Sequence, residues 1–258
     1  MGNLCADLFG SPSEDEAEAL ILEPEKCHSA SLIFLHGLGD TGAGWRDGFA
    51  GVGSELRIIL PTAPCMPVTL NGGAMMPSWF DIRGLTPDAP QDEQGIAAAA
   101  SRLRLLVEQE MADGIPPSKI FVGGFSQGGA VALHLAYTEG FAGRLGGVLG
   151  LSTWLPLAHI SSPQPHEPLE HLPPALLCHG GADRMVPLAF GKATAQLLRG
   201  RGIDVAFSEY PGMAHSSCSA EMREVRRFLE TRLEAMGGPG GSSADAAEEA
   251  TTTVSPHS

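Results

Sequence analysis

The sequence is short of positive charge. It holds 16 Lys and Arg against 30 Asp and Glu, a formal net charge of −14 over 258 residues. A surface that neutralises nucleic-acid phosphates needs an excess of Lys and Arg, so we expect no nucleic-acid partner. Residues 1–25 and 237–258 together contain ten acidic residues and no Lys or Arg. The segment between them is therefore nearly balanced in charge and gives no electrostatic hint about a substrate.

Cysteines are few and lack the spacing of metal ligands. They are five, an odd number, and no two of them form a CxxC pair. This pattern argues against a disulfide framework and against a zinc cluster, and we expect neither a metal nor a cofactor. Free thiols are typical of a reducing compartment. The cysteines are Cys5, Cys27, Cys65, Cys178 and Cys218.

Long hydrophobic runs are also absent. The N-terminus has neither the basic segment nor the apolar segment of a secretory signal. The most apolar long stretch, residues 145–160, is interrupted by glycines, Ser152, Thr153 and Pro156. It falls short of the roughly 20 residues that cross a bilayer. Together with the free thiols, these features predict a cytoplasmic protein.

The composition predicts one globular domain between two tails. Hydrophobic residues make up 43% of the chain and charged residues 18%, enough apolar side chain to offset the entropy lost on ordering. Neither the acidic N-terminal stretch nor the Gly-, Ser- and Thr-rich C-terminal stretch has an apolar period that could dock onto a core. We expect a flexible leader over residues 1–29, one domain over 30–236 and a disordered tail over 237–258.

Within the domain, short apolar runs alternate with longer amphipathic ones. This alternation is typical of an α/β fold, with a mostly parallel central sheet covered by helices on both faces. The expected strands are residues 31–35, 56–60, 119–123, 146–151, 175–178 and 205–210. The expected helices are residues 92–111, with Asp92 as N-cap, 127–138, 188–198 and 219–233.

A GxSxG motif, GFSQG, places Ser126 between an expected strand and an expected helix. In the nucleophile elbow such a turn lifts a serine hydroxyl above the sheet, and small residues around it leave room for the bend. The alternative is a Gly-rich turn whose serine only caps the helix. The strand-turn-helix context favours Ser126 as a nucleophile.

A serine hydroxyl needs a base, and in this type of site the chain order is Ser, acid, His. Asp183 and His215 follow Ser126 in that order, each just past an expected strand, so both would lie at the carboxyl edge of the sheet. Asp204 precedes its strand and would lie at the opposite edge. We interpret His134 as a surface or core residue, and His179 as a buried histidine near a strand end.

The oxyanion of an acyl-transfer intermediate needs two N–H donors. The backbone amide of Gln127, directly after the serine, is the first candidate. The Gly-rich loop HGLGD follows the first expected strand, and the Leu38 amide within it is the second. That loop alone is also compatible with a phosphate cradle. However, neither a Walker lysine nor a GxGxxG pattern accompanies it.

Several blocks resemble the acyl-protein thioesterase family, the cytosolic lysophospholipase-like carboxylesterases. They run from about residue 29 to 233 and are LIFLHGLGDTGAGW, LPTAPCMPVTLNGG, PSWFDIRGL, GGFSQGGAVALHLAY, LSTWLPL and YPGMAHSSC. The resemblance implies a single α/β-hydrolase domain without a separate cap domain. It also implies Ser126 as nucleophile, Asp183 as orienting acid, His215 as base, and the Leu38 and Gln127 amides as oxyanion hole.

The function that this resemblance implies is hydrolysis of fatty-acyl thioesters on S-acylated protein cysteines, through an acyl-enzyme intermediate. S-acylated proteins and acyl lipids would be the substrates. The alternatives are a lysophospholipase or general carboxylesterase and, in another class, a hydrolase-like protein that binds acyl ligands without turnover. An intact triad argues against the last.

An acyl chain would need a mostly apolar channel. Apolar side chains that lie in loops, outside the periodic elements, are candidates for its lining. The alternative is that these side chains merely cover the core. They are Leu70, Met75, Met76, Pro77, Trp79, Trp154, Leu155, Pro156 and Leu157.

The first residues approach a lipidation signal. MGNLCA matches the myristoylation pattern at Gly2 except that Ala6 replaces Ser or Thr, and Cys5 would be a neighbouring palmitoylation site. The acidic run that follows offers no attraction to an anionic leaflet. We expect peripheral membrane attachment only if both residues are acylated, and otherwise a disordered start.

Overall fold

A computed structural model gives the fold and describes residues 19–86, 88–139, 141, 144–158 and 172–236. The predicted tail over 237–258, most of the predicted leader, and the lipidation candidates Gly2 and Cys5 lie outside the described residues.

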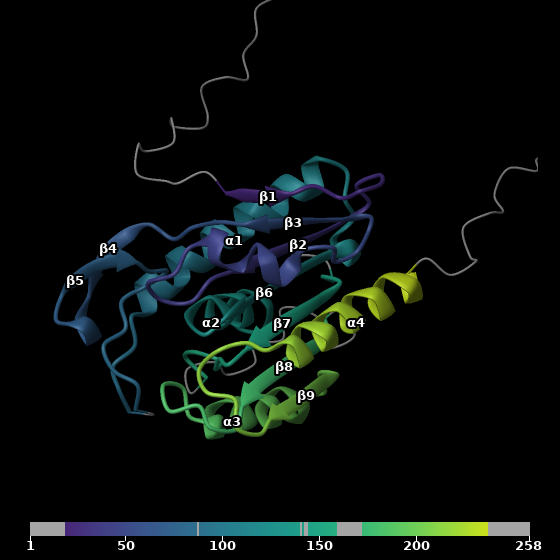
Figure 1. Cartoon of the computed structure of the whole chain (residues 1–258). Helices are drawn as coiled ribbons and strands as arrows, with labels where there is room; N and C mark the ends of the chain where they lie inside the picture. The colour runs from purple at the N-terminus through teal and green to yellow at the C-terminus, as the bar shows by residue number, and fades with distance from the viewer. Residues whose placement is uncertain (1–18, 87, 140, 142–143, 159–171, 237–258) are drawn as a thin grey trace, which may run out of the picture.

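The core of the molecule is a seven-stranded sheet in the order β1-β3-β2-β6-β7-β8-β9 (Figure 1). Every neighbouring pair is parallel except β1 with β3, which is antiparallel. The predicted mostly parallel sheet is thus confirmed. The strands are β1 (Leu20–Leu22), β2 (Ala30–Leu35), β3 (Leu56–Leu60), β6 (Ile120–Phe125), β7 (Gly147–Leu151), β8 (Ala175–Gly180) and β9 (Val205–Tyr210).

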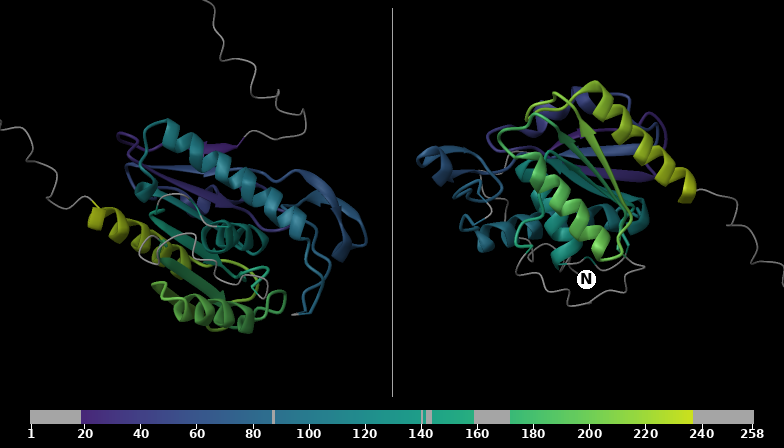
Figure 2. Two further views of the ribbon diagram at one scale, coloured as in Figure 1. Left: turned by 180° about the vertical axis from the view of Figure 1, so that it is seen from behind. Right: turned by 90° about the horizontal axis from the view of Figure 1, so that it is seen from below.

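Helices cover both faces of this sheet. Alternate residues of β2 show why its apolar run is continuous: Ile33 and Leu35 pack into one core layer, and Leu32 and Phe34 into the other. Figure 1 shows α4 in front of the sheet, and the reverse view in Figure 2 shows α1 on the far side. The first layer contains α1 (Glu93–Ala112), α2 (Gln127–His134) and α3 (Leu188–Gly200), and the second contains α4 (Ser219–Met236) with the short helices η1 (Gly42–Trp45) and η2 (Asp47–Phe49).

Two helix predictions need correction. Asp92 does precede α1, but its side chain does not cap the helix. Its carboxylate instead accepts the Asp81 N–H (3.0 Å) and pairs with Arg83 (3.2 Å). The helix predicted over 127–138 is α-helical only to His134 and continues as the π-helical turn η5 (Leu135–Glu139).

The structure adds elements that the sequence pattern did not predict. Strand β1 lies within the predicted leader, so a leader ending at residue 29 is too long. A two-stranded antiparallel hairpin, β4 (Cys65–Val68) and β5 (Ala74–Pro77), extends from the body. The remaining short helices are η3 (Thr69–Asn71) and η4 (Pro117–Lys119). Within the described residues, this hairpin is the largest addition to the sheet and its helices, and no cap domain interrupts them.

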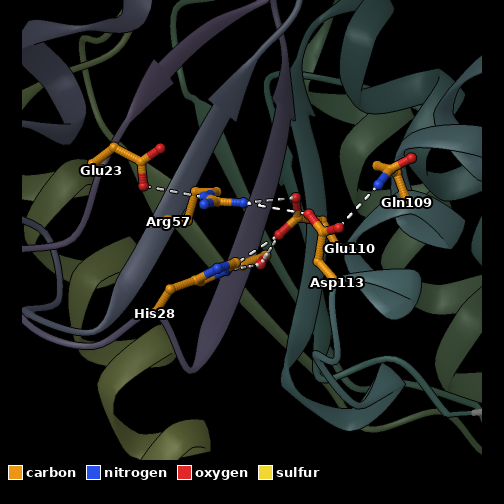
Figure 3. A network of polar contacts seen from close by, with 7 residues as sticks. Glu23, His28, Arg57, Gln109, Glu110 and Asp113 are labelled. Carbon is orange, nitrogen blue, oxygen red and sulfur yellow. Dashed lines mark hydrogen bonds and ion pairs between the residues drawn. The ribbon is translucent and has the colours of Figure 1, made fainter.

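A buried acid on α1 ties the first segments of the chain to the body. Glu110 is 3% exposed and accepts a hydrogen bond from the Ser31 hydroxyl of β2 (2.5 Å). His28 lies against both, 2.8 Å from Ser31 Oγ and 3.2 Å from Glu110 Oε2. Arg57 of β3 spans from Glu110 (3.5 Å) to Glu23 (3.2 Å), as Figure 3 shows. This network joins the residues just after β1 to two central strands and one helix.

Among the helices of the described ranges, none has the length and apolar character needed to cross a bilayer.

Candidate active site

Ser126 stands at the sharp turn between β6 and α2, in a conformation that serine rarely adopts. Its φ is 52° and its ψ is −118°. A non-glycine residue in such a region costs about 1–3 kcal/mol, so its surroundings must hold it there. The Ser126 N–H donates to Leu151 O (2.8 Å), and the Thr153 hydroxyl donates to Ser126 O (2.6 Å). Leu151 is the last residue of β7 and Thr153 lies two residues beyond it, so this segment fixes the turn.

The glycines of the motif are needed because backbones meet here without room for a Cβ. A Cβ on Gly128 would collide with the Leu35 carbonyl at the end of β2. A Cβ on Gly124 would collide with the backbone of Gly128. The helix therefore starts directly against two strand ends, and the serine side chain projects from the carboxyl edge of the sheet.

The three residues predicted from chain order meet at this edge. His215, in the loop after β9, lies with Nε2 2.9 Å from Ser126 Oγ. Its Nδ1 lies 2.7 Å from Asp183 Oδ2, in the loop after β8. A neutral imidazole satisfies both contacts when Nδ1–H donates to the carboxylate and Nε2 accepts the serine proton. The arrangement can generate a serine nucleophile.

The turn that follows Asp183 orients its carboxylate as a hydrogen-bond acceptor. Its side chain is fully buried. Oδ1 accepts the backbone N–H groups of Met185 and Val186, each at 2.9 Å. These two bonds fix the carboxylate rotation and leave Oδ2 for His215. The sequence did not predict this support, because it depends on the turn geometry.

The competing candidates lie elsewhere. Asp204 comes just before β9, at the amino edge of the sheet. His134 is buried at the end of α2, 3.4 Å from Glu139. His179 is buried near the end of β8, and its ring donates to Val186 O (2.8 Å). Burial lowers the pKa of His179 and so disfavours a charged ring 3.7 Å from Asp183.

The loop of residues 36–40 after β2 lies beside the serine. A Cβ built on Gly37 would be 3.5 Å from Ser126 Cβ. Two amides of this loop already have acceptors: Gly39 N–H donates to Pro77 O (2.9 Å), and Asp40 N–H donates to Gly37 O (3.2 Å). Leu38 N–H, between them, meets no acceptor in the part of the chain that the structure describes. It is available to a bound oxyanion, as is the Gln127 N–H in the first turn of α2.

An apolar cavity of about 260 Å³ reaches the loop of the acid. Met185 and Val186, which follow Asp183, form one end of it, while Ser126 and His215 are not part of its wall. The remaining wall comes from three segments far apart in the sequence. Its main apolar residues are Phe80, Ile82, Leu85, Trp154, Leu155, Phe190 and Leu197.

Only part of the predicted channel lining belongs to this cavity. Trp154 and Leu155 line it. The other predicted side chains do not line it, although the Leu70 N–H donates to Ile82 O (2.8 Å) in the cavity wall. They are Leu70 and Met75, which are exposed, Met76 and Pro77, which are half-buried, and Trp79, Pro156 and Leu157, which are buried. The sequence missed Phe80, Ile82, Leu85, Phe190 and Leu197.

The described residues contain no group of three or more His, Cys, Asp or Glu side chains placed to hold a metal ion.

Comparison with known proteins supports a common origin with esterases. The model of the Phospholipase/Carboxylesterase family matches residues 16–233. The chain is 40% identical over 226 residues to acyl-protein thioesterase 1 of Gibberella zeae, covering 83% of this chain and 95% of that protein. It is 37% identical over 217 residues to acyl-protein thioesterase 1 of Neurospora crassa, covering 80% and 88%. The crystal structure of Zea mays acyl-protein thioesterase 2 matches with a TM-score of 0.75 and 34% identity, over 84% of this chain and 99% of that one.

Proposed function

The chain belongs to the phospholipase/carboxylesterase family, and on that premise we propose that it is an acyl-protein thioesterase, a serine hydrolase that removes fatty-acyl groups from S-acylated protein cysteines. The observation that carries this proposal is the hydrogen-bonded series Ser126, His215 and Asp183 at the carboxyl edge of the sheet. The thioester specificity is supported by relatives that bear the name acyl-protein thioesterase at 37–40% identity.

The first half of the reaction forms an acyl-enzyme. Ser126 Oγ attacks the thioester carbonyl while His215 Nε2 takes its proton, and the carbonyl oxygen becomes an oxyanion. The Leu38 and Gln127 N–H groups donate to that oxyanion. When the tetrahedral intermediate collapses, the C–S bond breaks and the His215 proton passes to the leaving cysteine sulfur.

In the second half, water replaces the thiol. His215 takes a proton from the water, whose oxygen attacks the acyl carbon, and the same two amides hold the new oxyanion. The bond to Ser126 Oγ then breaks, the serine regains its proton from His215, and the fatty acid leaves. Asp183 stays ionised throughout and stabilises the imidazolium of each step.

The apolar cavity beside the acid loop is suited to the acyl chain. Each CH₂ that leaves water contributes about 0.8 kcal/mol, so a long chain gains more from such a wall than a short one. Trp154, Leu155 and Phe80 are the side chains we assign to this contact. S-acylated proteins are therefore preferred to short-chain esters, which would leave the cavity empty.

A comparison of three substrates tests the proposal. We expect kcat/KM to be highest for an S-palmitoylated peptide, lower for a lysophospholipid and lowest for a short-chain ester. A chromogenic thiol assay and fatty-acid release by mass spectrometry give the three values. A lysophospholipid preferred over the peptide would instead establish the alternative, a lysophospholipase of the same fold.

We also propose that the protein is cytoplasmic and attaches to membranes through acylation of Gly2 and Cys5. One myristoyl chain gives only marginal binding, so both groups are needed. Gly2→Ala or Cys5→Ser should each move the membrane-bound fraction to the cytosol without changing turnover of a soluble thioester. An intact mass from the native cells that shows an unmodified N-terminus would refute this attachment.

A further inference from the structure

The side chain of Gln127 is fully buried, although the preceding residue, Ser126, is the proposed nucleophile. Its Oε1 accepts the backbone N–H of Trp79 (3.0 Å), and its Nε2 donates to Ser78 Oγ (2.9 Å) and to Phe80 O (2.7 Å). Ser78 donates its own hydroxyl proton to Phe80 O (2.7 Å), so its oxygen is free to accept. One amide at the start of α2 therefore holds three consecutive residues of another segment.

The same segment also holds the Gly-rich loop on the other side of the serine. The Trp79 indole N–H donates to His36 O (2.8 Å), and Pro77 O accepts the Gly39 N–H (2.9 Å). These two bonds fix the loop backbone at His36 and Gly39, on either side of Leu38. Residues 77–80, which we name the brace, thus connect the two backbone amides assigned to the oxyanion.

The His36 side chain also fixes the backbone of this loop. Its ring is buried, Nδ1 donates to Gly37 O (2.7 Å), and Nε2 accepts the Ala63 N–H (2.9 Å). Burial lowers the pKa of His36, which keeps Nε2 unprotonated and able to accept. The carbonyl that receives the Trp79 indole is therefore part of a fixed backbone.

We propose that the brace sets the position of the Leu38 amide relative to the Gln127 amide, with the Gln127 side chain and the Trp79 indole as positioning groups for the oxyanion hole. The inference rests on the proposed function, in which both amides bind the oxyanion. Strand pairing brings the two segments together, but a productive donor must be held within about 0.5 Å. Four buried hydrogen bonds, together with the bond from Gly39 N–H to Pro77 O nearer the surface, supply that restraint.

The test compares Gln127→Met, which keeps the backbone N–H and the side-chain length, with Trp79→Phe, which removes the indole N–H. We expect each to lower kcat about 10- to 100-fold with little change in KM, because the oxyanion exists only beyond the ground state. The kcat of the double variant should be little lower than that of the less active single variant, since both substitutions break the same connection.

A second readout separates a loss of amide positioning from a general loss of structure, and it does not depend on the identity of the natural substrate. A long-chain trifluoromethyl ketone adds reversibly to Ser126 Oγ as a tetrahedral oxyanion, whereas the matching long-chain alcohol has the same chain and no oxyanion. Affinity for the ketone should fall in parallel with kcat, and affinity for the alcohol should not change. Tyr137→Phe is the matched control, because it removes a buried hydroxyl bonded to Pro173 O (2.9 Å) away from the site.

Several outcomes would overturn the proposed role of the brace. Unchanged ketone affinity in a folded Trp79→Phe variant is one, even if Gln127→Met fails to fold. Equal loss of ketone and alcohol affinity is another, since it would indicate a structural role only. Failure of the proposed function would look different: the wild-type protein would not turn over any acyl thioester, while the ketone comparison would still report on the brace.

Discussion

Substitution of Ser126 by Ala is expected to lower kcat by roughly 10⁴- to 10⁶-fold and to abolish labelling by a fluorophosphonate probe. The triad acts as a unit, so its remaining members cannot compensate for a missing nucleophile. Alanine keeps the Cβ, and the bonds that hold the turn use only the Ser126 backbone. The fold should therefore remain intact, which thermal unfolding by circular dichroism checks.

A second strained serine offers a matched control. Ser152 also has a positive φ, 47°, and is fully buried, and its hydroxyl has no hydrogen-bond partner among the described residues. Ser152→Ala should leave turnover within a few-fold of wild type. If Ser126→Ala kept turnover within tenfold, or if Ser152→Ala were the more damaging change, Ser126 would not be the nucleophile.

Asp183→Asn should lower kcat by about 10⁴-fold. The amides of Met185 and Val186 fix an acceptor at Oδ1, so the asparagine oxygen takes that position and its NH₂ faces His215. The imidazole must then accept at Nδ1 and carry its proton on Nε2. That tautomer donates to Ser126 Oγ and cannot take its proton. The kinetics of the folded variant measure the effect.

The control for this prediction is Asp204→Asn. Asp204 lies at the opposite edge of the sheet, before β9, and contributes its backbone carbonyl to the Ala175 N–H (2.9 Å). An asparagine there keeps that bond, so activity should stay near the wild-type level. A larger loss from Asp204→Asn than from Asp183→Asn would reassign the acid.

The sheet and the positions of the three site residues could be predicted from the sequence for a physical reason. Parallel strands buried on both faces give continuous apolar runs, and their carboxyl ends meet at one edge. Ser126 and Asp183 each follow such a run, and His215 follows β9, a partly buried edge strand of the same parallel sheet, so their places after strands put all three at one edge. This prediction uses only the order of the strands and the residues at their ends, and needs no knowledge of which side chains touch.

The hairpin and strand β1 could not be predicted in this way. Pro67 and Pro77 lie within β4 and β5, and proline in a run argues against a strand unless the strand is at an edge. Gly72 and Gly73 in the connecting turn, with φ of 67° and 82°, are a usable signal. Strand β1 has only three residues and shows no period.

The cavity and the brace depend on tertiary structure. The cavity wall combines residues 80–92, 154–158 and 185–197, which no local pattern connects. Trp79 was predicted to line an acyl channel, because it is an apolar residue in a loop. It belongs instead to the brace, where its indole N–H donates to the backbone carbonyl of His36. Gln127 was predicted only for its backbone amide, because a side chain next to a nucleophile gives no sequence sign of burial.

The most direct test of the central claim is acid quenching during turnover of an S-palmitoylated peptide, followed by peptide mass spectrometry. The account predicts that the peptide containing Ser126 transiently gains the mass of one palmitoyl group and that the Ser126→Ala protein neither gains it nor releases palmitate. Palmitate release at an undiminished rate from Ser126→Ala, or a palmitoyl group trapped on any other residue of the wild-type protein, would contradict it.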